Sequence, residues 1–527
     1  MARIGIYGWG VVAPRSPDIE AFTANLESSE SWLTPFEGFG PSNFLVGTPE
    51  FDFERYKGWI DERFPPGKFP QLRQKMGATT QYAIGAFIQA LGQNPGIEQA
   101  LQELGAEAQV LIGTGLGELP TCYEASIAYH RAMRRWARFW ADRARNSDRT
   151  RFDDAEEIER GHLSEEWDVP SDPAETIGDS EGAESREDAW NEYWLGRSDA
   201  LARFLLQLNE IESEGVHGNV EAGKLNTIRR KRTATQRLIA EYDCPTPPWL
   251  AVSTNVLWNI HNIPAAQISM LGRITGAAYA PVAACTSFGI GLYLATQAIQ
   301  TGAAKIVVIG AAEPPPHPLS VGTFYAARVL SGDTSPSLPL TDLRGTHVSG
   351  GACVWIIADH DHMQERGFSP LGLEIMGVGV TSDADHIITP SPAGQRAAME
   401  RALVDAGITA ADIGSWDLHA TATPGDALEV ATLEELLPKS VMITARKGTF
   451  GHGMGCGGGW ELLAQHIGLA QGRLHPTPLH REQLNNSISD AGFGYVLDQS
   501  CEAPSGAAGK LSMGVGGINA CVISRPW

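Results

Sequence analysis

The segment Ala283-Ala284-Cys285-Thr286-Ser287-Phe288-Gly289 lies where the run Tyr279-Ala-Pro-Val-Ala-Ala gives way to apolar residues at helical spacing, from Ser287 to Thr301. Cys285 is therefore expected at a strand-to-helix turn, a usual place to present a nucleophile. The positive end of the helix dipole favours the thiolate and predicts a lowered pKa for Cys285. Most free cysteines are nevertheless small buried core residues, so this segment alone leaves both interpretations open.

A first histidine, His419, ends a strand-like run and opens His419-Ala-Thr-Ala-Thr-Pro-Gly-Asp426. Thr421 and Thr423 would present hydroxyls from one side of an extended loop to a polar ligand. Asp426 is predicted to cap the helix that follows Pro424. Taken alone, His419 is better interpreted as a satisfied loop histidine above an ordinary helix start.

A second histidine, His452, ends Lys447-Gly-Thr-Phe-Gly-His452 and is followed by a run rich in glycine up to Gly459. Glycine at this density indicates backbone that packs closely or takes unusual dihedral angles, often where a ligand approaches. Lys447 is placed to hold a carboxylate or to orient a neighbour, although a flexible linker is the alternative. One thiol and two imidazoles together are the parts of a site that forms a thioester and handles a carbanion.

Composition limits the class of protein. A chain of 527 residues is too long for one ordinary core, and its 43% hydrophobic and 19% charged residues are typical of a globular protein. The net charge of −22 argues against general affinity for nucleic acid or anionic membranes. The start Met1–Val12 resembles a buried strand rather than a signal peptide, and no apolar window predicts a membrane span. Seven dispersed cysteines without a CxxC pair favour the reducing cytoplasm.

Strands and helices alternate through most of the chain, which predicts a layered α/β fold. Expected strands include 109–113, 305–310, 416–419 and 441–444, and expected helices include 287–301, 395–406 and 425–437. From about 127 to 242 the chain is polar and nearly free of strand signals, so we expect a largely helical insertion. Its basic segments, 131–151 and 229–232, would either dock an acidic partner or, as the stronger alternative, pair with the acidic block 153–187.

Two further patterns carry little weight. Gly113-Thr-Gly-Leu-Gly117 follows a strand but lacks the third glycine of a dinucleotide-binding loop. The histidines at 347, 360, 362 and 386 do not have metal-binding spacing, so no metal is assigned.

Taken together, these motifs resemble the β-ketoacyl-[acyl-carrier-protein] synthases of the elongating Cys-His-His type, condensing enzymes of the thiolase superfamily. Cys285 is similar to the family's nucleophile motif, and His419 to its His-Gly-Thr-x-Thr-Pro motif, with Ala420 replacing glycine. Lys447 and His452 fit its Lys-x-x-x-Gly-His motif, and 512–519 resembles its Gly-Phe-Gly-Gly-x-Asn loop. The segment 382–390 and the first strand also match, so the resemblance covers nearly the whole chain except the insertion.

The resemblance implies a thiolase fold, with two similar α/β halves forming a five-layered α-β-α-β-α core. The N-terminal half, 1–370, would carry Cys285 and the insertion, and the C-terminal half, 371–527, would carry both histidines. The implied reaction is decarboxylative Claisen condensation of an acyl group held on Cys285 with a malonyl thioester, as in fatty-acid or polyketide-like synthesis. His419 and His452 would stabilise the enolate, and Lys447 would order the site.

By the same resemblance, Thr421 and Thr423 would bind the pantetheine arm, and the backbone amides of Cys285 and Val515 would form the oxyanion hole. No cofactor is expected, because substrates arrive on the phosphopantetheine of acyl carrier protein. A cytoplasmic homodimer, or a heterodimer with a related subunit, is implied. The alternatives are a non-elongating chain-length partner subunit and a cysteine-dependent acyl transferase or hydrolase.

Three positions depart from the family pattern. Val515 stands where a phenylalanine usually gates access to the cysteine. Gly345 replaces an acidic residue, and Gly351 replaces a glutamate near the lysine. This last change predicts that Lys447 has lost an ionic partner.

Overall fold

The structure is a computed structural model that describes residues 2–40, 44–173, 180–216 and 220–527. It divides into two compact units. The main unit comprises Met1–Thr121 and Leu257–Trp527, and the insertion unit comprises Cys122–Val256. We keep these two names below.

Two sets of strands in the main unit repeat one topology. In chain order, the first set is β1 (Ile4–Val12), β4 (Ala108–Gly113), β5 (Ala278–Tyr279), β6 (Ile306–Glu313) and β7 (Gly351–Asp359). The second set is β8 (Leu371–Ser382), β9 (Ile413–Asp417), β10 (Met442–Thr444), β14 (Ala507–Gly514) and β15 (Ile518–Arg525). When the strands of each set are numbered 1 to 5 in chain order, both sets have the same spatial order across the sheet, 3-2-4-5-1. The parallel and antiparallel pairings also match, so the two sets fold alike.

The two sets meet where β1 pairs antiparallel with β8, with Ile4 opposite Ile375. Within the described residues this joins them, with β12 (Gly494–Tyr495) at one edge, into a single eleven-stranded sheet. Shorter elements complete the main unit: α1 (Ile19–Asn25), β2 (Thr34–Pro35), β3 (Leu45–Val46), α2 (Lys57–Arg63), α3 (Lys68–Lys75), α5 (Ile97–Leu104), α15 (Pro318–Ala326), α16 (His360–Glu365), α19 (Lys447–Phe450), β11 (Arg473–Leu474), α21 (Asn486–Ser489) and β13 (Cys501–Glu502).

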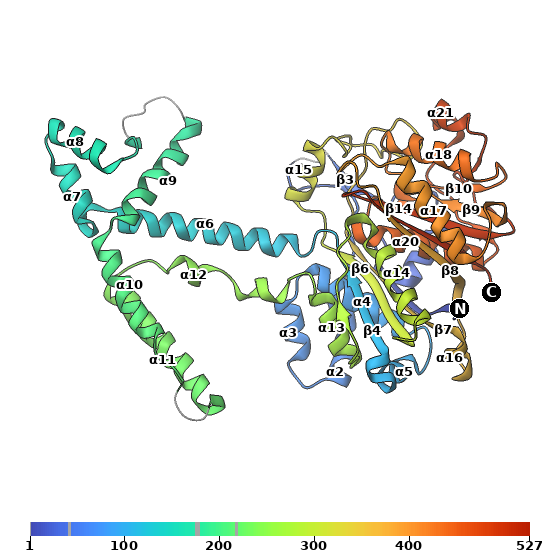
Figure 1. Ribbon diagram of the computed structural model, residues 1–527, viewed down its shortest axis with the longest axis horizontal. Coiled ribbons are helices and arrows are strands. Elements are labelled where there is room, and N and C mark those ends of the chain that lie inside the picture. Colours follow the sequence, from blue (N-terminus) through green and yellow to red (C-terminus); the bar gives the residue numbers. More distant parts are fainter. Residues whose placement is uncertain (1, 41–43, 174–179, 217–219) are drawn as a thin grey trace. The chain divides into compact units, whose positions relative to one another are not determined.

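Alternation of side chains along the strands builds five layers (Figure 1). In β6, Ile306 and Val308 face an outer core that contains α4 (Ala78–Leu91) and α13 (Ile263–Gly272). Val307 and Ile309 face the opposite way, toward α14 (Ser287–Gln300) and α20 (Met454–Ala470). The second set packs its other face on α17 (Pro392–Ala406) and α18 (Gly425–Leu436). Helices α14 and α20 therefore form the middle layer.

This architecture confirms the predicted fold class, and the strands and helices expected from periodicity are present with small shifts at their ends. The division of the chain at residue 370 stays a prediction. No helix among the described residues is long and apolar enough to cross a membrane.

The insertion unit is built from helices, as the sequence predicts. They are α6, which begins in the main unit (Leu119–Ala141), α7 (Ser147–Asp154), α8 (Glu157–Trp167), α9 (Ser180–Gly196), α10 (Asp199–Glu212), α11 (Val220–Glu241) and α12 (Pro248–Ala251). Trp136, Trp140 and Phe204 centre one small core, and Trp190 and Trp194 centre another. These aromatic cores give the unit apolar packing of its own.

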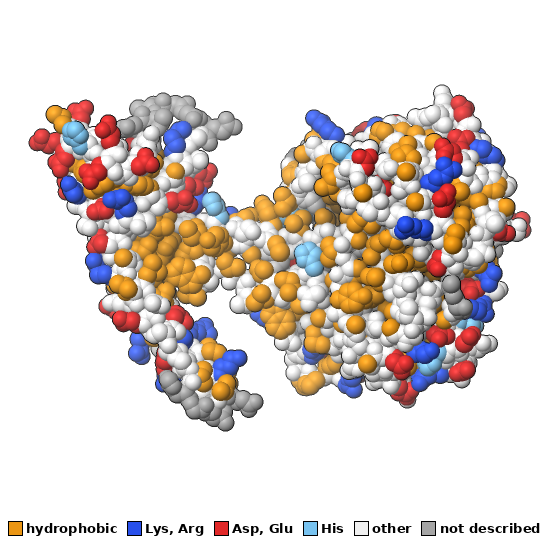
Figure 2. All heavy atoms as spheres, viewed as in Figure 1, with side chains coloured by type: hydrophobic (Ala, Val, Ile, Leu, Met, Phe, Trp, Pro, Cys, Tyr) orange, Lys and Arg blue, Asp and Glu red, His pale blue; other side chains and the backbone are white. Residues whose placement is uncertain are grey.

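Charges on the insertion unit are largely paired on its surface. Arg138 lies 2.8 Å from Glu187, and Arg143 lies 2.7 Å from Asp154. Figure 2 shows acidic and basic side chains interspersed over these helices. The pairing agrees with the stronger of the two interpretations of the basic segments, and docking of an acidic partner stays untested.

Candidate functional site

Cys285 lies in a 3-10 turn, Ala284–Thr286, between β5 and α14. Ala284 has a φ of 47°, in the left-handed region that a residue with a Cβ seldom adopts, so the backbone is strained beside the thiol. Cys285 is buried. Burial raises the pKa of the thiol to about 11, although Lys447 and the backbone amide of Val515 oppose that shift. The predicted lowering is therefore wrong, because desolvation of the thiolate outweighs the stabilising dipoles.

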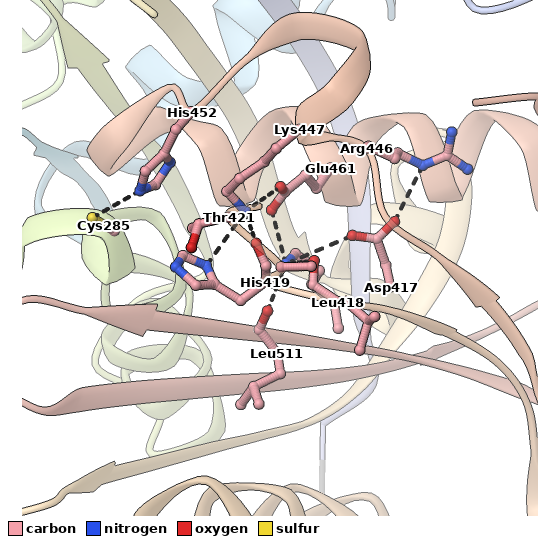
Figure 3. Close-up of polar contacts among 12 residues, drawn as sticks. Cys285, Asp417, Leu418, His419, Thr421, Arg446, Lys447, His452, Glu461 and Leu511 are labelled. Atoms are coloured by element: carbon pink, nitrogen blue, oxygen red, sulfur yellow. Dashed lines mark hydrogen bonds and ion pairs between the residues drawn. The ribbon is translucent and has the colours of Figure 1, made fainter. Parts of the chain in front are cut away.

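His452 and His419 lie together beside this thiol (Figure 3). His452 Nε2 is 3.2 Å from Cys285 Sγ, and the two imidazole centroids are 5.3 Å apart. Burial, followed by the charge of Lys447, lowers the pKa of both histidines well below the ordinary value of 6.5. Both rings are therefore neutral near pH 7.

The repeated topology explains why the thiol and His452 meet. Helix α14 follows β5, the third strand of the first set, and α20 follows β10, the third strand of the second set. Cys285 precedes α14 by two residues and His452 precedes α20 by two residues. The thiol and the adjacent imidazole thus occupy matching positions in the two halves of the sheet.

Two buried carboxylates fix the loop after His419. Glu429 accepts the backbone N–H groups of His419 and Ala420 at 2.8 and 2.9 Å. Asp426 does not cap α18 as predicted, since it lies inside the helix whose N-cap is Pro424. It instead accepts the N–H groups of residues 421, 422, 423 and 340. Its carboxylate serves the preceding loop because that loop turns back over the helix start.

Thr421 and Thr423 lie on this loop, and their hydroxyl oxygens are 3.0 Å apart. Both line a cavity of about 410 Å³ that contains Cys285, His419 and His452 on its wall. Val515 also lines the cavity, and it is 45% exposed. The remaining wall residues are mostly apolar or small: Phe324, Val329, Thr346, Ile388, Thr389, Pro390, Ala420, Pro424, Gly425, Asp426, Leu428, Met513 and Gly514. All the site residues predicted from sequence, except the buried Lys447, line this one cavity.

Lys447 has an ionic partner, so the predicted loss is wrong. Its Nζ lies 2.5 Å from Glu461 Oε1 on α20, 3.4 Å from His419 Nδ1, and also donates to the His419 carbonyl. Gly351 has a φ of 145°, and a Cβ there would lie 2.1 Å from the Val12 carbonyl oxygen. Gly345, at φ 119°, would likewise place a Cβ against backbone. These backbone positions exclude side chains, and the lysine is neutralised from a different helix.

The sequence analysis missed the buried charges around Lys447. Glu461 contacts Lys510 as well, at 2.8 Å, and Asp417 lies 3.2 Å from Arg446. All four side chains are at most 1% exposed. A signal was present, because Asp417 and Lys510 are the charged residues of two strands that otherwise contain apolar residues, glycine and one serine each.

Glu313 is a buried carboxyl group that, within the described part of the chain, has no cationic partner among its hydrogen-bond donors. Apart from the hydroxyl of Thr114, the groups that donate to it are backbone N–H groups. It accepts the N–H groups of Gly115, of Leu116 at 3.0 Å and of Gly455 at 3.0 Å. Burial raises the pKa of Glu313 to about 7. The glycine-containing loop 113–117 thus serves an internal carboxylate.

Among the described residues, no group of three or more histidine, cysteine, aspartate or glutamate side chains is placed to hold a metal ion. His347, one of the histidines considered in the sequence, is buried. It accepts the Ser337 N–H at Nε2 (2.8 Å), and its Nδ1 lies 3.0 Å from the Leu45 carbonyl oxygen. The expectation that no cofactor is needed stays a prediction.

Fold and site define a thiolase-type α/β protein that presents a cysteine beside two neutral histidines. Profiles of the Beta-ketoacyl synthase N-terminal and C-terminal domains match residues 234–362 and 373–480. The 3-oxoacyl-[acyl-carrier-protein] synthase 2 of Vibrio cholerae is 30% identical over 284 residues, 52% of this chain and 67% of that protein. Its namesake from Rhizobium meliloti is 29% identical over 275 residues, 50% of this chain. The protein belongs to the β-ketoacyl synthase family.

The match spans 64% of the Rhizobium relative, just under two thirds of its length. Several solved structures align with the whole of this chain, at a lower sequence identity than these relatives. The ishigamide ketosynthase/chain length factor has a TM-score of 0.67 at 19% identity and is 99% covered. A β-ketoacyl synthase from Burkholderia phymatum has a TM-score of 0.67 at 18% sequence identity. A type II ketosynthase in complex with its acyl-carrier protein has a TM-score of 0.63 at 18% sequence identity. This chain covers 100% of each of these two chains. These structures show that the fold is shared.

Proposed function

We propose that the protein is an acyltransferase that condenses an acyl group on Cys285 with a malonyl thioester, with loss of carbon dioxide. The observation that carries this proposal is the placement of Cys285 Sγ 3.2 Å from His452 Nε2, with the neutral His419 ring alongside, in the wall of one cavity. Family membership supports the same reaction. Fatty-acid and polyketide-like synthesis both use it.

In the acylation step, the Cys285 S–H donates to neutral His452, which acts as general base. The proton leaves as sulfur attacks the thioester carbonyl, which matters because the free thiol has a raised pKa. The backbone amide of Val515 lies close enough to the thiol to oppose that rise, so it is placed, with that of Cys285, to bind the developing oxyanion. The carrier thiolate then departs with the proton from His452.

In the condensation step, the neutral imidazoles of His419 and His452 donate hydrogen bonds to the malonyl thioester carbonyl. The bond to the carboxylate breaks, carbon dioxide leaves, and the electron pair forms an enolate that these donors stabilise. The enolate carbon attacks the acyl carbonyl and expels the Cys285 thiolate, which is then reprotonated. The product is a β-ketoacyl thioester two carbons longer.

Acyl carrier protein is the proposed carrier of both substrates, and no other cofactor is required. The paired hydroxyls of Thr421 and Thr423, on the wall of the cavity, are placed to bind the amide groups of a pantetheine arm. The solved ketosynthase bound to its acyl-carrier protein has the same fold, which supports this partner. Seven free cysteines favour a cytoplasmic location.

A dimer is proposed as the working state, either of two copies or with a related subunit. Strand β5 pairs with β4, and the backbone on its other side is unpaired within the described residues. Tyr279 and Val282 beside it are 43% and 55% exposed. Such an apolar sheet edge is suited to pairing with another chain.

The test supplies acyl and malonyl thioesters of acyl carrier protein and follows acyl-enzyme, carbon dioxide and β-ketoacyl product by mass spectrometry. Cys285→Ala is expected to abolish the acyl-enzyme, whereas His419→Ala should still acylate Cys285 but lose most decarboxylation. The exposed His480→Ala serves as the control. Decarboxylation without extension would indicate a chain-length partner subunit. Free acid from the acyl-enzyme, with no carbon dioxide, would indicate a hydrolase.

A further inference from the structure

Glu461 bridges two lysines that contact the backbone around His419. Its Oε1 lies 2.5 Å from Lys447 Nζ (Figure 3), and its Oε2 lies 2.8 Å from Lys510 Nζ. The three side chains come from α20, α19 and β14, and each is at most 2% exposed. Lys510 is therefore tied to the same carboxylate as the lysine that touches the His419 ring.

The two ammonium groups hold consecutive carbonyls of the chain that carries His419. Lys447 donates to the His419 carbonyl oxygen, and Lys510 donates to the Leu418 carbonyl oxygen at 3.2 Å. Glu429 accepts the N–H groups of the same two peptide groups, those of His419 and Ala420, at 2.8 and 2.9 Å. The backbone on both sides of the imidazole is thus held by three side chains from three elements.

Lys510 is itself fixed by the sheet. It lies opposite Asp417 in the parallel register of β14 and β9, and its Nζ is 3.6 Å from Asp417 Oδ1. Thr444, opposite Asp417 in β10, donates to Asp417 Oδ2 at 2.5 Å, and Arg446 lies 3.2 Å from that oxygen. Lys510 also donates to the Leu511 carbonyl oxygen at 2.5 Å. A lysine held by two carboxylates and two carbonyls keeps one position without rearranging during the reaction.

Lys510 also contributes charge to the site. Its positive charge disfavours protonation of both His419 and His452, in the same direction as Lys447 and burial. Around His419, the charged and titratable groups on the surrounding elements are Cys285, Asp426, Glu429, Lys447, His452, Glu461 and Lys510. Burial is the largest cause of the lowered pKa of His419, and the charge of Lys510 adds to that of Lys447 in the same direction.

We propose that Lys510 is a positioning residue for the condensation step, which holds the Leu418–His419 backbone and biases His419 toward its neutral, hydrogen-bond-donating form. It acts through Glu461 and the backbone and does not touch substrate. This inference rests on the proposed function. It predicts that Lys510 matters for decarboxylation, where His419 acts, and much less for acylation, where His452 contacts the thiol.

The experiment compares wild type with Lys510→Met, Lys510→Arg and a control, Lys305→Met. Lys305 directly precedes β6 and is ion-paired with Asp359 of β7 at 3.1 Å. For each purified variant, single-turnover acylation of Cys285 and steady-state carbon dioxide release from malonyl carrier protein are measured against pH. Misplacing a donor by about 1 Å costs up to roughly a hundredfold in rate.

Lys510→Met is expected to lower carbon dioxide release on the order of tenfold to a hundredfold, with acylation near the wild-type rate. The acidic limb of the pH profile of carbon dioxide release should move to higher pH. Losing a cation raises the pKa of His419, so the ring becomes protonated at a higher pH than in the wild type. Lys510→Arg should restore that limb toward the wild-type position. Lys305→Met should match wild type in both assays.

Equal loss of acylation and decarboxylation, or an unmoved acidic limb, would overturn the proposal by showing a purely structural ion pair. If Lys510→Met does not fold, Lys510→Ser replaces it, because its hydroxyl and an admitted water can satisfy the carbonyls without a charge. The same outcomes then apply to Lys510→Ser. A wild-type enzyme that releases no carbon dioxide would instead refute the proposed function, so the two failures are distinguishable.

Discussion

The main unit and the insertion unit both pair acids with bases, but in opposite environments. Glu461 and its two lysines are almost fully buried, whereas Arg143 and Asp154 of the insertion unit are each more than half exposed. Buried charges lose hydration that only their partners replace, while exposed pairs are screened by water and salt. An acid–base pair therefore holds the backbone beside His419 in one unit and contributes little more than solubility in the other.

The largest expected effect comes from breaking the buried bridge. Glu461→Gln leaves Lys447 and Lys510 buried without their shared carboxylate, so the unfolding free energy of the main unit should fall by about 3–5 kcal/mol. Hydrogen exchange of the sheet strands, followed by mass spectrometry at increasing denaturant concentration, measures this fall. Glu187→Gln, which removes the partner of Arg138 in the insertion unit, is the matched control. A similar small change in both variants would mean that burial does not distinguish the two environments.

An intermediate effect should separate two kinds of buried carboxyl group. Glu313, held by amides without a cation, has a pKa of about 7 against an ordinary 4.5. Its raised pKa means that the protonated carboxyl stabilises the fold below pH 4.5, and that this stability is lost as the pH rises through 7. Between pH 5 and 8, wild type should lose about 2–3 kcal/mol more than Glu313→Gln.

Thermal unfolding of wild type and Glu313→Gln across this pH range provides the measurement. The two proteins are compared by how steeply the free energy of unfolding changes with pH. A destabilisation that is the same at every pH, such as that from placing the Gln amide against backbone N–H groups, therefore cancels. Parallel curves for the two proteins would contradict the raised pKa.

The smallest effect is expected at the surface of the insertion unit. Arg143→Ala removes an exposed pair and should change stability by at most about 1 kcal/mol, less at high salt. Denaturant titrations at low and high ionic strength, monitored by helix content, would measure it. A loss as large as that for Glu461→Gln would show that exposure is a poor guide to the value of an ion pair.

Much of the candidate site could be predicted from sequence because its residues stand in local motifs. Cys285, His419 and His452 each lie in a short, glycine- or alanine-rich segment between a strand and a following helix, and the fold brings those segments together. The helical insertion was predictable for the opposite reason, since its polar composition excludes strands of a buried sheet.

The rest depends on contacts between distant segments. Glu461 is 14 residues from Lys447, and Lys510 belongs to a strand far along the chain, so no local motif links them. The raised pKa of Cys285 was missed for a related reason, because burial is a property of the whole fold and here exceeds the local helix dipole. Asp426 resembles a helix cap in sequence, and only the turn of the preceding loop gives it four amide donors.

The position of the insertion has a consequence for synthesis. Strand β4 ends at Gly113, and its parallel neighbour β5 begins at Ala278, so 164 residues separate the two. At roughly 5–20 residues per second, a ribosome needs roughly 8–33 seconds to make that stretch. During this delay both edges of β4 lack their partners, because β6 also follows the insertion, while the insertion helices, with aromatic cores of their own, are free to fold. The order of translation thus favours a folded insertion before the turn that bears Cys285 is complete.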